Sequence, residues 1–436
     1  MSLSGGIPPS QAEAALFLAR LAGAAPIETH ISAIFVGRDT AWKMKKAVAL
    51  GFLDFTSLDA RARFCRRELE LNQPAAPGIY RDVVALTRAA DGALREGGAG
   101  PAVEWVLRMA PIPAGDFLDA VAARGGLDAA LLDGLGDTVF RLHGAAPEVP
   151  GLDAPAAMAQ VLDGNLRAAR RAGLPETLLM PLTDALQAAL SQAAPLLAAR
   201  AAAGHLRRCH GDLHLGNLCL WQGKPTPFDA LEFDEALAQI DTGYDLAFLL
   251  MDLDQRAGRA AANRVLNRYV ARSGDAGLLA ALPLWLALRA LVRAHVAAAR
   301  GQDGEPLLRA ALAYLRPAPP RLVAVGGLQG TGKSSLARLL APQLGAAPGA
   351  LLLRSDELRK RRFGLAPEER LPAEAYTEAV SLSIHDELFT NAEGALRHGH
   401  SVILDAVFLD AEHRAAAARL AAQLAVPFQG FWLEAP

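Results

Sequence analysis

The strongest constraint on the fold of this chain is an eight-residue stretch, Gly-Leu-Gln-Gly-Thr-Gly-Lys-Ser at 327–334, which directly follows a predicted, mostly apolar strand at 321–326. It fits the pattern G-x-x-x-x-G-K-[ST], which requires a loop between a strand and a helix. In that setting the glycines let backbone N–H groups approach phosphate oxygens, and the following helix adds its positive end. The stretch therefore predicts a nucleotide-binding α/β domain, with an incidental glycine-rich turn as the alternative.

The loop and the first helical turn supply the expected nucleotide-binding residues. These are Gly327, Gly330, Thr331, Gly332, Lys333, Ser334 and Ser335, with the Ser334 hydroxyl also expected on Mg²⁺. Further strands are predicted at 350–354, 401–405 and 427–433. Strands that alternate with helices indicate a parallel sheet whose ligands bind at the carboxyl ends of the strands. Asp356 and Asp405 should therefore share one rim of the sheet with Lys333.

This half of the chain resembles small P-loop kinases of the gluconate-kinase and zeta-toxin type. The resemblance rests on Ser355-Asp356 after the second predicted strand and on the stretch 405–408, Asp-Ala-Val-Phe. It implies that Asp356 orients or deprotonates an acceptor hydroxyl, that Arg359 holds acceptor or phosphate, and that Asp405 stands at the metal-water position. A helix N-cap is the alternative role for Asp356.

Kinases of that type continue into a lid that supplies arginines to the transferring phosphoryl group, followed by a further strand and helix. This chain stops at Pro436, directly after its fourth predicted strand. We therefore expect a P-loop domain that lacks its lid and C-terminal part, as a fragment or as a degenerate domain that binds nucleotide without efficient transfer.

The second constraint is the stretch 210–217, His-Gly-Asp-Leu-His-Leu-Gly-Asn. Its spacing H-x-D-x-x-x-x-N is that of a kinase catalytic loop, in which the Asp receives a proton from the attacking hydroxyl and the Asn holds magnesium. Asp212 is the expected catalytic base and Asn217 the expected metal ligand. Asp229, which begins an acidic run directly after an apolar residue, is the expected second ligand. A turn between strands, with helix-capping Asp and Asn, is the alternative.

The same stretch resembles the catalytic loop of the aminoglycoside phosphotransferase family, a branch of the protein-kinase-like fold. That family writes the loop H-G-D-x-H-x-x-N, and His214 fits the second histidine. The resemblance implies that Asp245, at the start of a later helix, braces the catalytic loop.

A kinase-like fold also needs a strand lysine that grips the α- and β-phosphates. Lys43 is the expected lysine, in a predicted hairpin at 28–48, with Lys45 taking its place only if the strand register differs. The resemblance implies that Glu68, in the predicted helix 58–71, pairs with this lysine. A solvated helical face is the alternative for Glu68.

A proline-rich stretch, Arg-Pro-Ala-Pro-Pro at 316–320, marks the clearest boundary, since two adjacent prolines break a helix and favour an extended linker. The expected fold is α/β with two domains. Residues 1–316 form a protein-kinase-like α+β bilobal domain, 317–320 the linker, and 321–436 a P-loop α/β parallel-sheet domain. The resemblance spans nearly the whole chain, in the arrangement of bacterial bifunctional aminoglycoside phosphotransferase/ATP-binding proteins.

Composition excludes several other classes. Of 436 residues, 52% are hydrophobic and 21% charged, which excludes a disordered chain, and a net charge of −2 disfavours a nucleic-acid partner. Three widely spaced cysteines form no disulfide framework and favour a reducing cytoplasm. The most apolar window, 278–288, contains Pro283 and precedes two arginines, which indicates a buried helix and no membrane association.

The sequence therefore predicts an ATP- and Mg²⁺-dependent phosphotransferase for a small hydroxylated acceptor, fused to a P-loop ATP-binding domain. The alternative is a nucleotide-responsive regulatory or scaffold protein with a degenerate kinase half. The acceptor should bind among the helices of 114–205 and after 245. Acidic residues there, such as Asp133, Asp137 and Asp163, form no cluster in sequence, so aminoglycoside resistance is not predicted.

Overall fold

The computed structural model describes residues 6–50 and 53–434. Their contacts define two compact units, each built from separate stretches of sequence. The first unit lies within Met1–Val121, Arg208–Ile240 and Ala299–Gly301. The second lies within Ala122–Arg207, Asp241–Ala298 and Gln302–Pro436.

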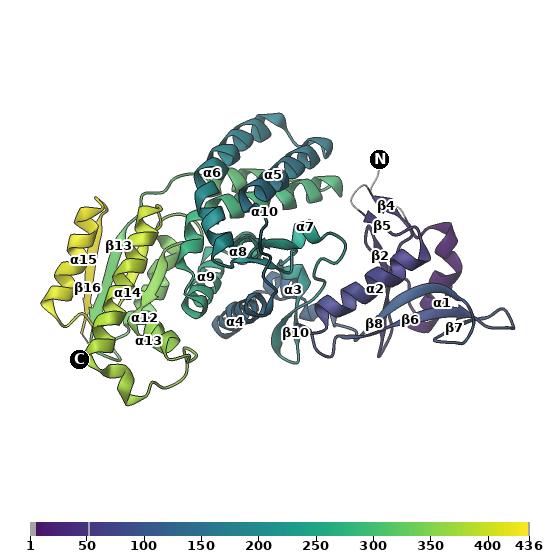
Figure 1. Ribbon diagram of the computed structural model, residues 1–436, viewed down its shortest axis with the longest axis horizontal. Coiled ribbons are helices and arrows are strands. Elements are labelled where there is room, and N and C mark those ends of the chain that lie inside the picture. The colour runs from purple at the N-terminus through teal and green to yellow at the C-terminus, as the bar shows by residue number, and fades with distance from the viewer. Residues whose placement is uncertain (1–5, 51–52, 435–436) are drawn as a thin grey trace. The chain divides into compact units, whose positions relative to one another are not determined.

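The first unit is built around a six-stranded antiparallel sheet with helix α2 (Leu58–Asn72) packed against it (Figure 1). The order of its strands is β1 (Ile27–Glu28), β2 (Ser32–Val36), β3 (Ala41–Lys45), β8 (Ala102–Met109), β6 (Tyr80–Arg88) and β7 (Leu94–Glu96). The hairpin expected at 28–48 and the helix expected at 58–71 are both present.

Strand β3 is buried on both faces, and its two faces have opposite chemistry. Trp42 and Met44 join an apolar core with Leu18 of helix α1 (Ala12–Ala22). Because side chains alternate along a strand, Lys43 and Lys45 project together from the other face, where they meet α2.

Further short elements of the first unit include η3 (Leu215–Asn217), which ends the expected catalytic stretch, and the hairpin that follows it. They are β4 (Ala49–Leu50), β5 (Leu53–Asp54), η2 (Ala114–Asp116), the start of α3 (Leu118–Ala123), η3, β10 (Leu218–Trp221), β11 (Lys224–Pro227) and α7 (Glu235–Ala238). Strands β10 and β11 form an antiparallel hairpin between the expected catalytic loop and the acidic run.

The second unit begins as a helical assembly in which α4 packs against α9, α5 against α6, and α8 against α9. Its helices are α4 (Ala129–Ala145), α5 (Ala154–Arg171), α6 (Glu176–Ala202), α8 (Thr242–Arg256), α9 (Arg259–Ser273), α10 (Leu282–Ala299) and α11 (Glu305–Tyr314). Of the described residues, the helical stretch Ala276–Ala299 alone is long and apolar enough to cross a membrane, and 67% of its most apolar window is buried. Most of that window is buried, as the sequence predicts for a helix of the core.

The second unit continues into a four-stranded parallel sheet, which confirms the expected P-loop fold (Figure 1). The order of its strands is β14 (Leu351–Arg354), β15 (Val402–Asp405), β13 (Leu322–Gly327) and β16 (Phe428–Leu433). The helices around it are α12 (Lys333–Leu340), α13 (Ser355–Arg362), α14 (Glu378–Arg397) and α15 (Ala411–Gln423).

Helix α9 covers the outer edge of this sheet. The side-chain amide of Asn263 donates to the Ala350 carbonyl at 3.0 Å, and the backbone N–H of Leu352 donates to the amide oxygen of Asn267 at 2.7 Å. These amides take the place of a neighbouring strand, so backbone groups at the edge of β14 are satisfied. The helices before the proline-rich stretch and the sheet after it are therefore joined side by side.

Candidate active sites

Two loops of the first unit are fastened together by hydrogen bonds. The Nε2 atom of His210 lies 2.9 Å from the Phe228 carbonyl, the N–H of Leu231 donates to the His210 carbonyl at 3.0 Å, and the N–H of Phe228 donates to the Asn217 carbonyl at 3.0 Å. Gly211 lies between them with φ +84°, where a Cβ atom would come within 3.2 Å of Leu231. This close approach explains a glycine at that position.

The expected base and the first expected metal ligand lie in contact. The amide of Asn217 donates to the backbone carbonyl and to the Oδ2 atom of Asp212, each at 2.9 Å. The Asp212 carboxylate is 40% exposed, and His214 places its Nε2 atom 3.4 Å from it. Because the Asn217 amide group is directed to Asp212, its carbonyl oxygen is the atom left for a cation.

The expected phosphate lysine lies between two carboxylates. Lys43 Nζ is 2.6 Å from Glu68 Oε1 and 2.5 Å from Asp229 Oδ1. Burial opposes the charge on Lys43, but Asp229 and Glu68 outweigh it and raise its pKa well above the ordinary value. Burial also opposes the charge on Glu68 and by itself would raise its pKa. Lys43 and Lys45 outweigh burial and bring the pKa of Glu68 to about 2. Lys43, Glu68 and Asp229 are thus brought together, and Lys43 and Glu68 are charged at neutral pH.

Lys45 is part of the same cluster, whereas the sequence pattern indicated it only as a substitute for Lys43. Its ammonium lies 2.8 Å from Glu68 Oε2 and forms a second ion pair with Glu232. The physical reason is strand geometry, since residues two apart on a strand share a face. That alternation was the sequence signal for Lys45, and the acidic run was the signal for Glu232.

The acidic run is held in an unusual backbone conformation. Asp229 has φ +61°, a region that residues other than glycine seldom adopt. Its N–H donates to the Tyr80 hydroxyl at 2.9 Å, and the N–H of Ala230 donates to the Asn72 side-chain oxygen at 2.8 Å. Tyr80 and Asn72 are distant in sequence, and no motif pointed to them. The Asp229 carboxylate remains 41% exposed.

The donor set of this site fits a magnesium ion. The amide oxygen of Asn217 and the carboxylate of Asp229 are hard oxygen ligands of the kind that Mg²⁺ prefers. The hydrogen bond from Phe228 to Asn217 joins the two segments that carry them.

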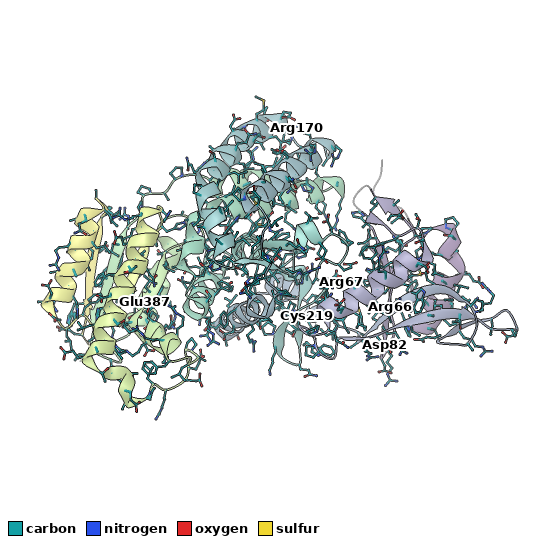
Figure 2. The ribbon with its side chains drawn as sticks, viewed as in Figure 1. Arg66, Arg67, Asp82, Arg170, Cys219 and Glu387 are labelled. Atoms are coloured by element: carbon teal, nitrogen blue, oxygen red, sulfur yellow. The ribbon has the colours of Figure 1, made fainter. Side chains whose placement is uncertain are left out.

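Cys219 of β10, labelled in Figure 2, is buried, and burial raises the pKa of its thiol to about 12. This agrees with a buried thiol and not with a nucleophile.

The glycine-rich loop of the second unit, where phosphate binding is expected, has glycines at positions that a side chain would strain. Gly330 and Gly332 have φ values of +85° and +87°, and at Gly327 a Cβ atom would lie 2.4 Å from the Leu433 carbonyl. Lys333 begins α12 and donates to the Leu328 carbonyl at 2.6 Å, across the loop. The hydroxyl of Thr331 donates to the same carbonyl at 2.8 Å, and Ser335 lies in the first turn of α12.

Ser334 and Asp405 meet, as the shared rim requires. The Ser334 hydroxyl donates to Asp405 Oδ2 at 2.6 Å, and a hydroxyl with a carboxylate is a donor pair suited to Mg²⁺. Arg354 was not anticipated: its guanidinium lies 3.1 Å from Asp405 Oδ2 and 3.0 Å from Ser334 Oγ, and it also pairs with Glu357.

The expected acceptor residues of the second unit have other partners. Asp356 lies in the first turn of α13, where it pairs with Lys360 at 2.9 Å; the N-cap position belongs to Arg354. Arg359 donates to the Ala375 carbonyl and lies over the Tyr376 ring, 5.3 Å from its centroid. Arg361, also on α13, pairs with Glu387, which Figure 2 labels on α14.

Comparison with known families identifies the class of each half. Residues 93–291 match the model of the "Phosphotransferase enzyme family", and residues 322–436 match an "AAA domain". The chain therefore combines a kinase-like phosphotransferase enzyme domain with a P-loop-type α/β domain. It is 30% identical over 413 residues to the uncharacterized protein Rv2004c of Mycobacterium tuberculosis, covering 91% of this chain and 80% of the relative. Mb2027c of Mycobacterium bovis matches to the same extent, and the chain belongs to the family of these mycobacterial proteins.

Partial similarity to solved structures is also found, two of them titled as kinases or kinase family proteins. A choline/ethanolamine kinase family protein from Mesorhizobium loti is 14% identical with a TM-score of 0.40, covering 70% of this chain and 93% of that one. Choline kinase from Cryptosporidium parvum is 10% identical with a TM-score of 0.43, covering 66% of this chain and 87% of that one.

Proposed function

We propose that the first site transfers a phosphoryl group from Mg²⁺-bound ATP to the hydroxyl of a small molecule. The observation that carries this proposal is the contact of Lys43 with both Glu68 and Asp229, on a segment hydrogen-bonded to the one that holds Asp212 and Asn217. A strand lysine, a helical glutamate and an acidic metal ligand form the phosphate clamp of kinase-like enzymes.

Each of these side chains has one role in the proposed reaction. The exposed carboxylate of Asp212 accepts the proton of the attacking hydroxyl, and the Asn217 amide holds that carboxylate in place. Lys43 moves from Asp229 to the nucleotide phosphates, while Glu68 keeps it on the sheet. Asn217 and Asp229 would hold a magnesium ion, which would neutralise charge on the phosphate oxygens.

We assign nucleotide binding, with Mg²⁺ on Ser334 and Asp405, to the second site. Phosphoryl transfer there would need Asp356 and Arg359 to leave Lys360 and the Ala375 carbonyl. These contacts favour a nucleotide-responsive role for the second domain, with Asp356 as acceptor base as the alternative. A small-molecule acceptor, a cytoplasmic location and no nucleic-acid or membrane partner complete the proposal.

Turnover of ATP by the full chain tests the first site. In a Lys333→Ala background, which silences the second site, a library of hydroxylated metabolites is screened for stimulated ATP consumption. Asp212→Asn should reduce acceptor-dependent turnover by about 10²–10⁴-fold, the usual contribution of a general base, and leave nucleotide affinity unchanged. Asp356→Asn is the matched control and should have no effect in this background. Stimulated turnover that survives Asp212→Asn would refute the proposed mechanism.

A further inference from the structure

The charged side chains of the first site form an unbroken series in which acid and base alternate. In order they are Asp229, Lys43, Glu68, Lys45 and Glu232. The exposed fractions of these side chains are 41%, 10%, 0%, 1% and 5% along the series. One end is therefore accessible to a ligand, whereas the end formed by Lys45 and Glu232 is not.

The buried end cannot act on a phosphate directly. Lys45 is closed off by Glu68 and Glu232, and the Phe55 ring lies 5.3 Å from its ammonium. Removing either partner of a buried ion pair leaves an uncompensated charge, which is strongly destabilising. The Lys45–Glu232 pair can therefore affect the site only by holding together the two segments that it joins.

Those segments are β3 and the loop that carries Asp229. Glu232 lies three residues after Asp229, and the backbone between them is also held by Tyr80 and Asn72. Beyond it, Arg67 of α2, labelled in Figure 2, pairs with Glu235 at 2.9 Å. All of these contacts can persist during the reaction. The contact of Asp229 with Lys43 cannot, because Lys43 is the group proposed to move to the nucleotide.

We propose that Lys45 and Glu232 are positioning residues, whose ion pair keeps the Asp229 loop on the sheet when Lys43 exchanges Asp229 for the nucleotide phosphates. The inference rests on the proposed function of the first site. It gives the two lysines of β3 different roles, since Lys43 contacts the nucleotide and Lys45 holds the metal-binding loop. The left-handed backbone at Asp229 needs such support, since a strained conformation persists only where its surroundings fix it.

The test measures metal affinity without turnover. The full chain with Lys333→Ala and Asp212→Asn is titrated with Mg²⁺ at a fixed concentration of a fluorescent ATP analogue. Glu232→Gln should raise the Mg²⁺ concentration needed for half-maximal binding by about 10–100-fold, the usual effect of losing support behind a metal ligand. In an Asp229→Asn background the same substitution should have no further effect, because the ligand it positions is already gone.

Two further variants keep the test decisive. Lys45→Met with Glu232→Leu removes both charges and retains apolar volume, so it serves if Glu232→Gln does not fold, and it should show the same loss. Lys46→Met is the matched control, because Lys46 is equally buried but pairs with Glu28, away from the loop, and Mg²⁺ dependence should be unchanged. Equal losses with and without Asp229, or no loss, would overturn the inference. Absence of any Asp229-dependent Mg²⁺ requirement in the starting protein would instead refute the proposed function.

Discussion

At the level of single residues, the main feature of the first site is one carboxylate, Glu68, that two lysines share. Glu68 is fully buried, yet Lys43 and Lys45 contact its two oxygens and keep it ionised. Neutralising Glu68 would leave two ammonium groups short of a partner in the protein interior. The ionisation of this one residue is therefore tied to the stability of the whole sheet-facing cluster.

Acid titration should reveal this link. The pKa of Glu68 is about 2 in the folded chain, below its ordinary value, so its stabilising effect is present above about pH 4.5 and is lost as the pH falls toward 2. We expect the free energy of unfolding, measured with urea between pH 6 and pH 3, to decrease more steeply in wild type than in Glu68→Gln. Glu70→Gln, an exposed change on the same helix, should parallel wild type. Parallel curves for wild type and Glu68→Gln would contradict the expectation.

The sequence predicted the side chains with fixed spacing and missed those that reach the site from elsewhere. Asp212 and Asn217 are five residues apart, and their contact follows from local loop geometry. Tyr80 and Asn72 support the acidic run by hydrogen bonds that span roughly 150 residues of sequence, and no local pattern encodes such a contact. Lys45 lay within reach of sequence reasoning, had the two-residue period of a strand been applied to it.

Among the secondary-structure elements, α9 has two roles. Asn263 and Asn267 face strand β14, whereas Tyr269 reaches His143, whose other ring nitrogen lies 3.2 Å from the buried Asp245. The bracing role that the resemblance implies for Asp245 stays a prediction. The sequence indicated a helix here, but its amphipathic pattern could not show that asparagines would serve as partners for a sheet edge.

Loss of one of these asparagines should weaken the junction. Asn267→Leu leaves the Leu352 N–H without its partner at a buried edge, which costs about 1–3 kcal/mol of unfolding free energy. Gln343→Ala removes an exposed side-chain hydrogen bond to Leu339 and should change stability by less than about 0.5 kcal/mol. Urea unfolding of both variants measures the difference, and equal stabilities would argue against a role for Asn267.

On the scale of the whole molecule, the second unit combines helices of the kinase-like domain with the P-loop sheet. Arg268 of α9 shows the connection, because its guanidinium contacts Asp137 of α4 at 2.6 Å and Glu368, which follows α13, at 2.7 Å. The proline-rich stretch marked a change of fold in the sequence, but composition could not reveal that the two sides would pack together.

Nucleotide bound to the P-loop should therefore stabilise helices that it does not touch. At 100 times its Kd, a ligand adds about 2.7 kcal/mol to the stability of the unit that binds it. In a Lys43→Met background we expect ATP with Mg²⁺ to slow amide hydrogen exchange in α8, α9 and α10, as well as around the loop. Lys333→Ala should abolish the effect. Slower exchange confined to residues 321–434 would show that the two parts respond independently.

The pairing of α9 with β14 also bears on how this chain can be divided. A fragment that begins at residue 321 would expose the unpaired edge of β14 to solvent. Exposed strand edges promote self-association, so a fragment cut at the prolines should aggregate. Conversely, a protease that cleaves within residues 316–320 would break the peptide chain but leave the hydrogen bonds of Asn263 and Asn267 with the sheet edge intact. The two fragments should then co-elute in gel filtration, as subunits of a complex do.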